Sequence, residues 1–304
     1  MDLDRDGGPG TYSIVAVDPA TGEVGVGVQS RYFAVGRIVP WVRPGVGAVA
    51  TQSNCNASYG PEGLDLLAQG VSPAEVIERL SARDPERETR QWAIIDMAGE
   101  AACRTGSQCN AWAGQRPGTN CHAQGNLLSG PEVVDALADE FARATGSLAD
   151  RIMRGLEAAE AAGGDLRGSQ SAAILVYRWD GAGAAPYSAE VDLRVDDHGD
   201  PIGELRRIYQ VREAQGLAWQ ARQLARDGAA GAAAAMADAL TLNPRDDLVL
   251  AMAAEVAFRQ GDRARAAELL RQAMARNEKA ICYVTIFGAD ELYDDAFRRE
   301  VIDE

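Results

Sequence analysis

The chain has 304 residues, of which 46% are hydrophobic and 25% are charged, and its formal net charge is −15. This composition fits a globular protein with room for two domains. The negative charge argues against nucleic acid or an anionic membrane as partner, because both bind clustered positive charge. No apolar run approaches the roughly 18 residues of a spanning helix, and no signal peptide or glycine-rich phosphate loop is present. The chain has five cysteines, an odd number that fits reduced thiols better than a disulfide framework. We therefore expect a cytoplasmic protein with reduced thiols and no cofactor.

Residues 1–10 are acidic and rich in glycine, so we expect a flexible leader. A hairpin follows this leader. Its first arm, residues 10–17, is apolar on both faces, which is typical of a strand in the middle of a sheet. Its second arm, residues 23–31, alternates valine with glycine, so one face is expected in the core while the other allows close approach to the backbone.

Strand and helix signals then alternate up to about residue 207. Strands are expected at 37–41, 45–50, 169–177 and 188–195, with a second hairpin at 91–103. Helices are expected at 61–69, 72–80, 131–144 and 147–162. The long irregular segment 106–130 is predicted to be a functional loop or lid. This order predicts an α+β domain, residues 11–207, with helices on the outer faces of its sheets.

From residue 208 to 304 the composition turns to Ala, Arg, Leu and Glu, with no strand pattern. Several residues recur at an offset of about 34, which is the tetratricopeptide period: Asn243 and Asn277, Ala232 and Ala266, Ala239 and Ala273. Two copies are fewer than an independent solenoid needs. We therefore expect an all-α helical-repeat domain that packs on the first domain or on another subunit, either as a homo-oligomer or with a protein partner.

Several stretches of the first domain resemble known families. They are residues 10–17 (GTYSIVAV), 26–30 (VGVQS), 33–36 (FAVG), 45–52 (GVGAVATQ) and 170–173 (QSAA). The first of these resembles the opening of the N-terminal-nucleophile (Ntn) hydrolases, and together they resemble, over about 11–205, a bacterial family recorded as domain of unknown function 1028. The resemblance implies a four-layer αββα sandwich. It also implies an amidohydrolase in which a threonine, freed at a Gly-Thr bond, attacks a small amide.

Thr11 is the candidate nucleophile. A freed α-amine, with a pKa of about 7.7–8.0, can act as base for the hydroxyl of the same residue, so no histidine is required. The alternative is an ordinary strand threonine in an intact chain. The protein would then be a catalytically inactive Ntn-fold protein that binds a small ligand or a protein. The resemblance places Gln29 and Arg37 where a proteasome-like site has aspartate and lysine, although neutral glutamine and permanently charged arginine differ chemically from both.

Five further residues are candidate substrate-binding or oxyanion donors, with backbone hydrogen bonding as the alternative for each: Ser30, Thr51, Gln52, Asn126 and Gln170. No metal is expected. Cys109, Cys121 and His122 lack the paired spacing of zinc sites. Asp192, Asp196, Asp197 and His198 form an acidic strand end that could bind a cation, but we expect a solvated turn there.

Overall fold

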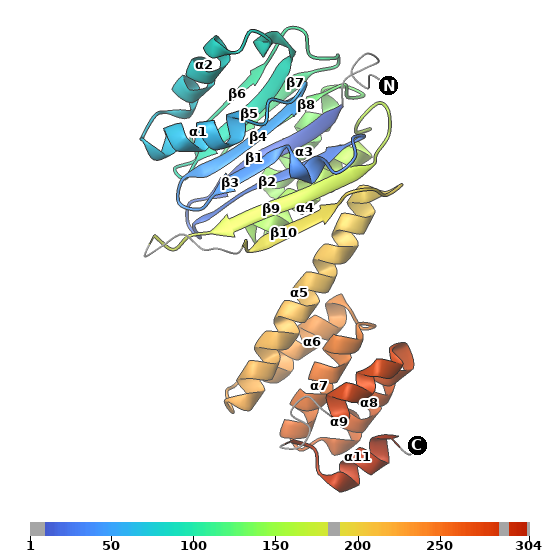
Figure 1. The fold of residues 1–304 in the computed structure, drawn as a ribbon. Coiled ribbons are helices and arrows are strands. Elements are labelled where there is room, and N and C mark those ends of the chain that lie inside the picture. The colour runs from blue at the N-terminus through green and yellow to red at the C-terminus, as the bar shows by residue number, and fades with distance from the viewer. Residues whose placement is uncertain (1–9, 182–188, 286–291, 303–304) are drawn as a thin grey trace. The chain divides into compact units, whose positions relative to one another are not determined.

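The computed structural model describes residues 10–181, 189–285 and 292–302, so the expected leader at 1–9 lies outside the described residues. The chain divides into two compact units, residues 1–206 and 207–304. Figure 1 shows strands and helices in the first unit and helices in the second. The helix α5 (Pro201–Arg226) begins in the first unit and ends in the second.

A six-stranded antiparallel sheet holds the first hairpin at its centre. Its strand order is β10-β9-β2-β1-β8-β7. The strands are β1 (Thr11–Asp18), β2 (Glu23–Ser30), β7 (Gly114–Gly118), β8 (Cys121–Asn126), β9 (Ser171–Arg178) and β10 (Val191–Val195). The predicted hairpin is therefore confirmed, and the apolar first arm is a central strand, as its buried faces require.

A four-stranded antiparallel sheet has the order β3-β4-β5-β6. Its strands are β3 (Pro40–Arg43), β4 (Gly47–Ser53), β5 (Arg90–Asp96) and β6 (Ala101–Thr105). The β5-β6 pair confirms the second predicted hairpin. The strand expected at 37–41 begins later than predicted, because residues 35–37 form a turn of 3₁₀-helix.

The two sheets face each other across one apolar core. Alternate valines of β1 and β2, among them Val15 and Val26, belong to the same buried cluster as Ala50 and Ile95 of the second sheet. This packing follows from the period of two along each strand, which sends every second side chain into the core. The opposite faces of both sheets are then left for helices.

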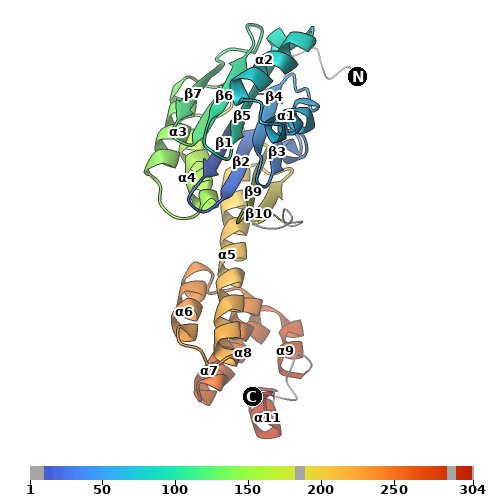
Figure 2. The ribbon, with the colours of Figure 1, turned by 90° about the vertical axis from the view of Figure 1, so that its left-hand side faces the viewer.

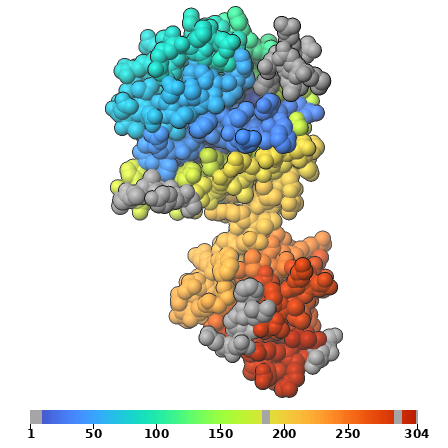
Figure 3. All heavy atoms as spheres, viewed as in Figure 1, coloured from blue at the N-terminus to red at the C-terminus, as the bar shows by residue number. Residues whose placement is uncertain are grey.

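Helices cover both outer faces. The helices α3 (Glu132–Arg143) and α4 (Leu148–Ala161) pack on the six-stranded sheet, while α1 (Tyr59–Ala68) and α2 (Pro73–Arg83) pack on the four-stranded sheet. Figure 2 shows these helix pairs on opposite sides of the strands, and Figure 3 shows α1 at the surface in light blue. Ser72 and Ser147 cap α2 and α4, and the four predicted helices are confirmed.

The prediction of an irregular loop over 106–130 is wrong, because this segment contains β7 and β8. The strand β8 pairs with β1 on one side and with β7 on the other, and all six of its residues are buried. Its sequence, CHAQGN, has no β-branched residue. The strand therefore forms because of its position between two partners and not because of local propensity.

The second unit contains only helices among its described residues: α6 (Ala232–Leu242), α7 (Asp247–Arg259), α8 (Arg263–Arg276), α9 (Cys282–Thr285) and α11 (Asp295–Ile302), together with most of α5. Asp246 and Asp262 cap α7 and α8 with their side chains. The core of this unit is rich in alanine, which lets the helices approach closely, and Phe297 and Met252 fill the space between them.

Candidate active site

Thr11 is the first residue of the central strand β1 and is only 1% exposed. Its neighbours across the two adjacent strands are Ser30 and Asn126. Residues directly opposite each other in antiparallel strands point to the same face of the sheet. Thr11, Ser30 and Asn126 therefore share the face that meets the second sheet, from which Gln52 Nε2 donates to the Thr11 carbonyl oxygen at 3.1 Å.

The carbonyl group of Gly10, on the bond that joins Gly10 to Thr11, accepts two hydrogen bonds. The donors are Ser30 Oγ at 2.6 Å and Arg167 Nη2 at 3.0 Å. Thr11 Oγ1 in turn donates to Ser30 Oγ at 3.0 Å. The hydroxyl of Thr11 is thus connected through Ser30 to the carbonyl that precedes it. Two donors on one carbonyl oxygen, one of them cationic, polarise that group toward nucleophilic attack.

Asp165 completes this site with a buried carboxylate. Its side chain has no exposed surface and binds Arg167 Nη2 at 2.7 Å and the backbone nitrogen of Arg31 at 3.1 Å. A Cβ atom added at Gly10 would lie 2.6 Å from the Asp165 carboxylate, so only glycine fits at position 10. The sequence analysis did not identify Asp165 or Arg167. They follow the glycines at 163–164, and nothing in their local pattern marks a site.

A network of buried amides lies between the sheets beside Thr11. Gln91 Oε1 accepts from Gln52 Nε2 at 2.9 Å and from Asn126 Nδ2 at 3.0 Å. Gln91 Nε2 lies 2.8 Å from the Gly125 carbonyl oxygen. Gln52 also accepts from the hydroxyl of Ser13 at 2.6 Å. The network fixes the amides of Gln52 and Asn126 on the face of Thr11, and Gln91 is a further residue that the sequence analysis missed.

The structure does not bring Gln29 or Arg37 to Thr11. Gln29 is opposite Tyr12, so its side chain points to the other face of the sheet, where its amide has no partner among the described residues. Arg37 is exposed in the 3₁₀ turn and lines a separate hollow with Trp41 and Arg194. The alternation of side chains along β2 puts Ser30, and not Gln29, beside the candidate nucleophile.

Two other predicted binding residues also lie apart from Thr11. Thr51 precedes Gln52 on β4 and points to the opposite face, where its hydroxyl donates to the Asn56 carbonyl oxygen at 3.2 Å. Gln170 is partly exposed and donates to Asp197 at 3.0 Å. Of the five predicted binding residues, the structure groups Ser30, Gln52 and Asn126 around Thr11.

The space beside Thr11 is closed. A hollow of only about 10 Å³ borders it, lined in part by Tyr32, Val39 and Cys55. This volume holds about one water molecule and no substrate. The site can therefore admit a ligand only after residue 10 leaves its position or the surrounding residues 32–39 move.

No three His, Cys, Asp or Glu side chains group to hold a metal ion within the described ranges. Burial lowers the pKa of His122 to about 4 and raises the pKa of the Cys121 thiol to about 11. Without a bound cation Cys121 therefore keeps its proton at neutral pH. None of the described helices has both the length and the hydropathy of a membrane span.

Residues 11–205 match the model of a family of unknown function, DUF1028. The chain belongs to DUF1028. This chain is similar to another DUF1028 protein, from Silicibacter pomeroyi, whose crystal structure is known and whose sequence is 32% identical. The match covers 66% of this chain and 85% of that protein, with a TM-score of 0.61. Among curated proteins, none matches this DUF1028 chain.

Proposed function

We propose that this DUF1028 protein is an Ntn-type amidohydrolase that acts on a small amide through Thr11 after the Gly10–Thr11 bond is cut. The observation that carries this assignment is the polarised Gly10 carbonyl, held by Ser30 and Arg167 beside the Thr11 hydroxyl. The stacking of α3 and α4, two antiparallel sheets, and α1 and α2 supports the αββα sandwich of Ntn hydrolases.

The cut begins when Thr11 Oγ1 attacks the Gly10 carbonyl carbon. Ser30 and Arg167 stabilise the negative charge that develops on the carbonyl oxygen. The C–N bond then breaks, the hydroxyl proton passes to the departing nitrogen, and an ester joins Gly10 to the Thr11 side chain. Water hydrolyses that ester, which restores the hydroxyl and leaves a free α-amine on Thr11.

The freed α-amine can then serve as the base that activates the hydroxyl of Thr11 toward an amide substrate. Removal of residue 10 also vacates the space beside the Asp165 carboxylate, which a Cβ atom at Gly10 would approach to 2.6 Å. The carboxylate of Asp165 would orient an ammonium or amide N–H group there. On the same face Asn126 Oδ1 is buried and has no hydrogen-bond partner among the described residues, so it could accept from the N–H group of a small amide substrate.

Intact-mass measurement tests the cut. Protein freshly purified from its native host should contain a species that begins at Thr11. We expect Thr11→Ala to abolish this species together with any amidase activity, whereas Thr11→Ser should keep some of both because serine retains a hydroxyl. Ser30→Ala removes one donor from the carbonyl and should slow the cut by about 10²–10³-fold.

Thr21→Ala is the matched control, because Thr21 is exposed in the turn of the same hairpin and its hydroxyl contacts only the Asp18 carbonyl oxygen and the Glu23 carboxylate, at the end of β1 and β2 away from Thr11. This variant should be cut like the wild type. A full-length mass under all conditions would exclude the amidohydrolase and leave the second candidate, an inactive Ntn-fold protein that binds a small ligand. The 1% exposure of Thr11 in the intact chain, where its backbone nitrogen is still an amide, favours the absence of catalysis in that second candidate.

We also propose that the helical unit is a tetratricopeptide-like module for assembly. Two features support this reading: Gly228 and Gly261 both have positive φ at the ends of helices, and Asn243 and Asn277 end α6 and α8 with φ of −144° and −146°. The second pair preserves the 34-residue offset in backbone geometry. Light scattering should show a homo-oligomer of the full chain, and a monomer at all concentrations would contradict this role.

A further inference from the structure

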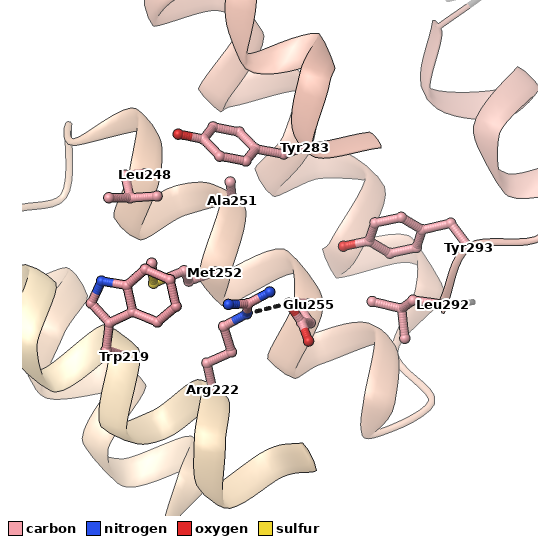
Figure 4. Close-up of a pocket in the computed structure, with 9 residues that line it drawn as sticks. All are labelled: Trp219, Arg222, Leu248, Ala251, Met252, Glu255, Tyr283, Leu292 and Tyr293. Carbon is pink, nitrogen blue, oxygen red and sulfur yellow. Dashed lines mark hydrogen bonds and ion pairs between the residues drawn. The ribbon is translucent and has the colours of Figure 1, made fainter. Parts of the chain in front are cut away.

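A pocket of about 260 Å³ lies within the helical unit, between α5, α7 and the segments near α9 and α11. Figure 4 shows its walls, which are mainly aromatic and apolar: Trp219, Met252, Tyr283 and Tyr293. Small-molecule sites are typically concave and apolar with a few polar groups that orient the ligand. The two charged residues on this wall are Arg222 and Glu255.

The guanidinium of Arg222 is held in place by two contacts. Its Nε donates to Glu255 Oε2 at 2.5 Å, and its Cζ lies 5.0 Å from the centre of the Trp219 ring. Neither terminal nitrogen has an acceptor among the described residues. Figure 4 shows the guanidinium inside the pocket, between the tryptophan ring and the carboxylate. An oriented guanidinium with two available amino groups matches the two oxygens of a carboxylate.

Arginines gather around the carboxylate of Glu255. Besides Arg222, the carboxylate of Glu255 binds Arg226 Nε at 2.8 Å and Arg259 at 3.0 Å, so three arginines surround one glutamate. Burial opposes ionisation of Glu255, but the hydrogen bonds from Arg226 and Arg222 outweigh it and lower its pKa. One negative charge is therefore fixed among three arginines, while Asp246 and Asp247 act on Tyr283, another residue that lines the pocket.

We propose that this pocket binds a small carboxylate with an apolar or aromatic body. The carboxylate lies on the terminal nitrogens of Arg222, and the body lies against Trp219 and Met252. The volume of the pocket limits that body to about the size of one aromatic ring with a short chain. All residues that line the pocket lie in the second unit, so the inference does not depend on the chemistry of Thr11.

Calorimetric titration of the full chain with phenylpropanoate tests the site, with phenylpropanol as the uncharged analogue. We expect the acid to bind at least tenfold more tightly than the alcohol, because a hydrogen-bonded charge pair contributes that much. Arg222→Gln should weaken acid binding by at least tenfold. Ala251→Met, which fills the pocket and keeps the guanidinium, should weaken both ligands.

Arg226→Gln is the matched control. Like Arg222→Gln, it removes one positive charge and one hydrogen bond to Glu255, but Arg226 does not line the pocket. Binding should change less than about threefold, and circular dichroism should show wild-type helix content in all variants. Equal binding of acid and alcohol, or an Arg222→Gln variant that binds like the wild type, would overturn the assignment. Equal losses in the two arginine variants would also overturn it, since the net charge alone would then explain binding.

Two sources could supply this ligand chemistry, a free acid or the carboxyl end of a peptide. N-acetyl-alanyl-phenylalanine distinguishes them, since it presents the same carboxylate and ring on a chain. Affinity at least tenfold above that of phenylpropanoate identifies a peptide end, and equal or lower affinity identifies a free acid. Binding of either ligand that Arg222→Gln weakens supports the assignment of this pocket as a carboxylate site.

Discussion

Replacement of Asp84 by asparagine should destabilise the first unit in a manner that depends on pH. Asp84 follows α2 and is only 8% exposed, and it accepts hydrogen bonds from Tyr59 Oη at 2.8 Å, Arg90 Nε at 3.0 Å and Asn56 Nδ2 at 3.2 Å. Burial would raise the pKa of this carboxyl, but the bonds from Tyr59 and Arg90 outweigh burial and lower it from 3.8 to about 2.

A folded-state pKa below the unfolded value means that the unfolded chain binds the proton more tightly, so protonation favours unfolding. The contribution of Asp84 is complete above pH 4 and is lost as the pH falls through about 2. The difference between the pKa values of 3.8 and about 2 corresponds to roughly 2.5 kcal/mol of unfolding free energy. Solvent in the hollow that Asp84 lines screens these interactions and reduces the contribution to about 2 kcal/mol. We therefore expect Asp84→Asn to lose about 2 kcal/mol of unfolding free energy at pH 7.

Urea unfolding followed by tryptophan fluorescence measures this loss, because Trp92 lies 4.5 Å from the ring of Tyr59. The control is Asp65→Asn, which breaks an exposed ion pair with Arg43 and should change stability by less than about 0.5 kcal/mol. The gap between wild type and Asp84→Asn should close between pH 4 and pH 2. A loss below 0.5 kcal/mol at pH 7, or a gap that persists at pH 2, would refute this account.

Three further predictions concern buried positions. Gly27→Ala should lose about 1–3 kcal/mol in urea unfolding, because its new Cβ would lie 2.4 Å from Ile152 Cγ2; an unchanged midpoint would contradict this. Gln91→Leu should cost about 2–4 kcal/mol by leaving buried amides and carbonyls unpaired, also measured with urea. In proton NMR, one of the two histidine signals should titrate near pH 4, assigned to His122 by His122→Gln. Its contribution to stability should be complete above pH 6.5 and lost as the pH falls through 4; a signal assigned to His122 that titrates near 6.5 would contradict this.

Local patterns predicted the elements whose sequence carries a clear period. The valine–glycine alternation of β2 predicted the second arm of the hairpin, and the helices α2 and α4 were expected within a few residues of their observed bounds. The strand β8 was missed because its polar sequence has no strand propensity, and only pairing with β1 makes it a strand. Local sequence information cannot reveal a partner that lies a hundred residues away.

The sequence predicted only part of the candidate site, again because local patterns do not reveal contacts between distant residues. Ser30 lies opposite Thr11 in a hairpin, so a short register count places it beside the nucleophile. Arg167 and Asp165 reach Gly10 from a turn after α4, through a contact that no periodicity encodes. Gln91 lies in a largely apolar strand, where a single amide is easily read as an exception, although its hydrogen bonds to five neighbours make it part of the site.

The contact between Arg167 and Gly10 has a consequence for the order of events during synthesis. The two residues are 157 positions apart, and β1 also needs β8 as its second neighbour. Long-range contacts of this kind form late, because the chain must close a large loop before they are made. A nascent chain therefore carries the Gly10–Thr11 bond in an unactivated state until about residue 167 has emerged and folded. If the proposed cut takes place, it reports that the first unit is complete, and a chain that misfolds or stops early stays uncut.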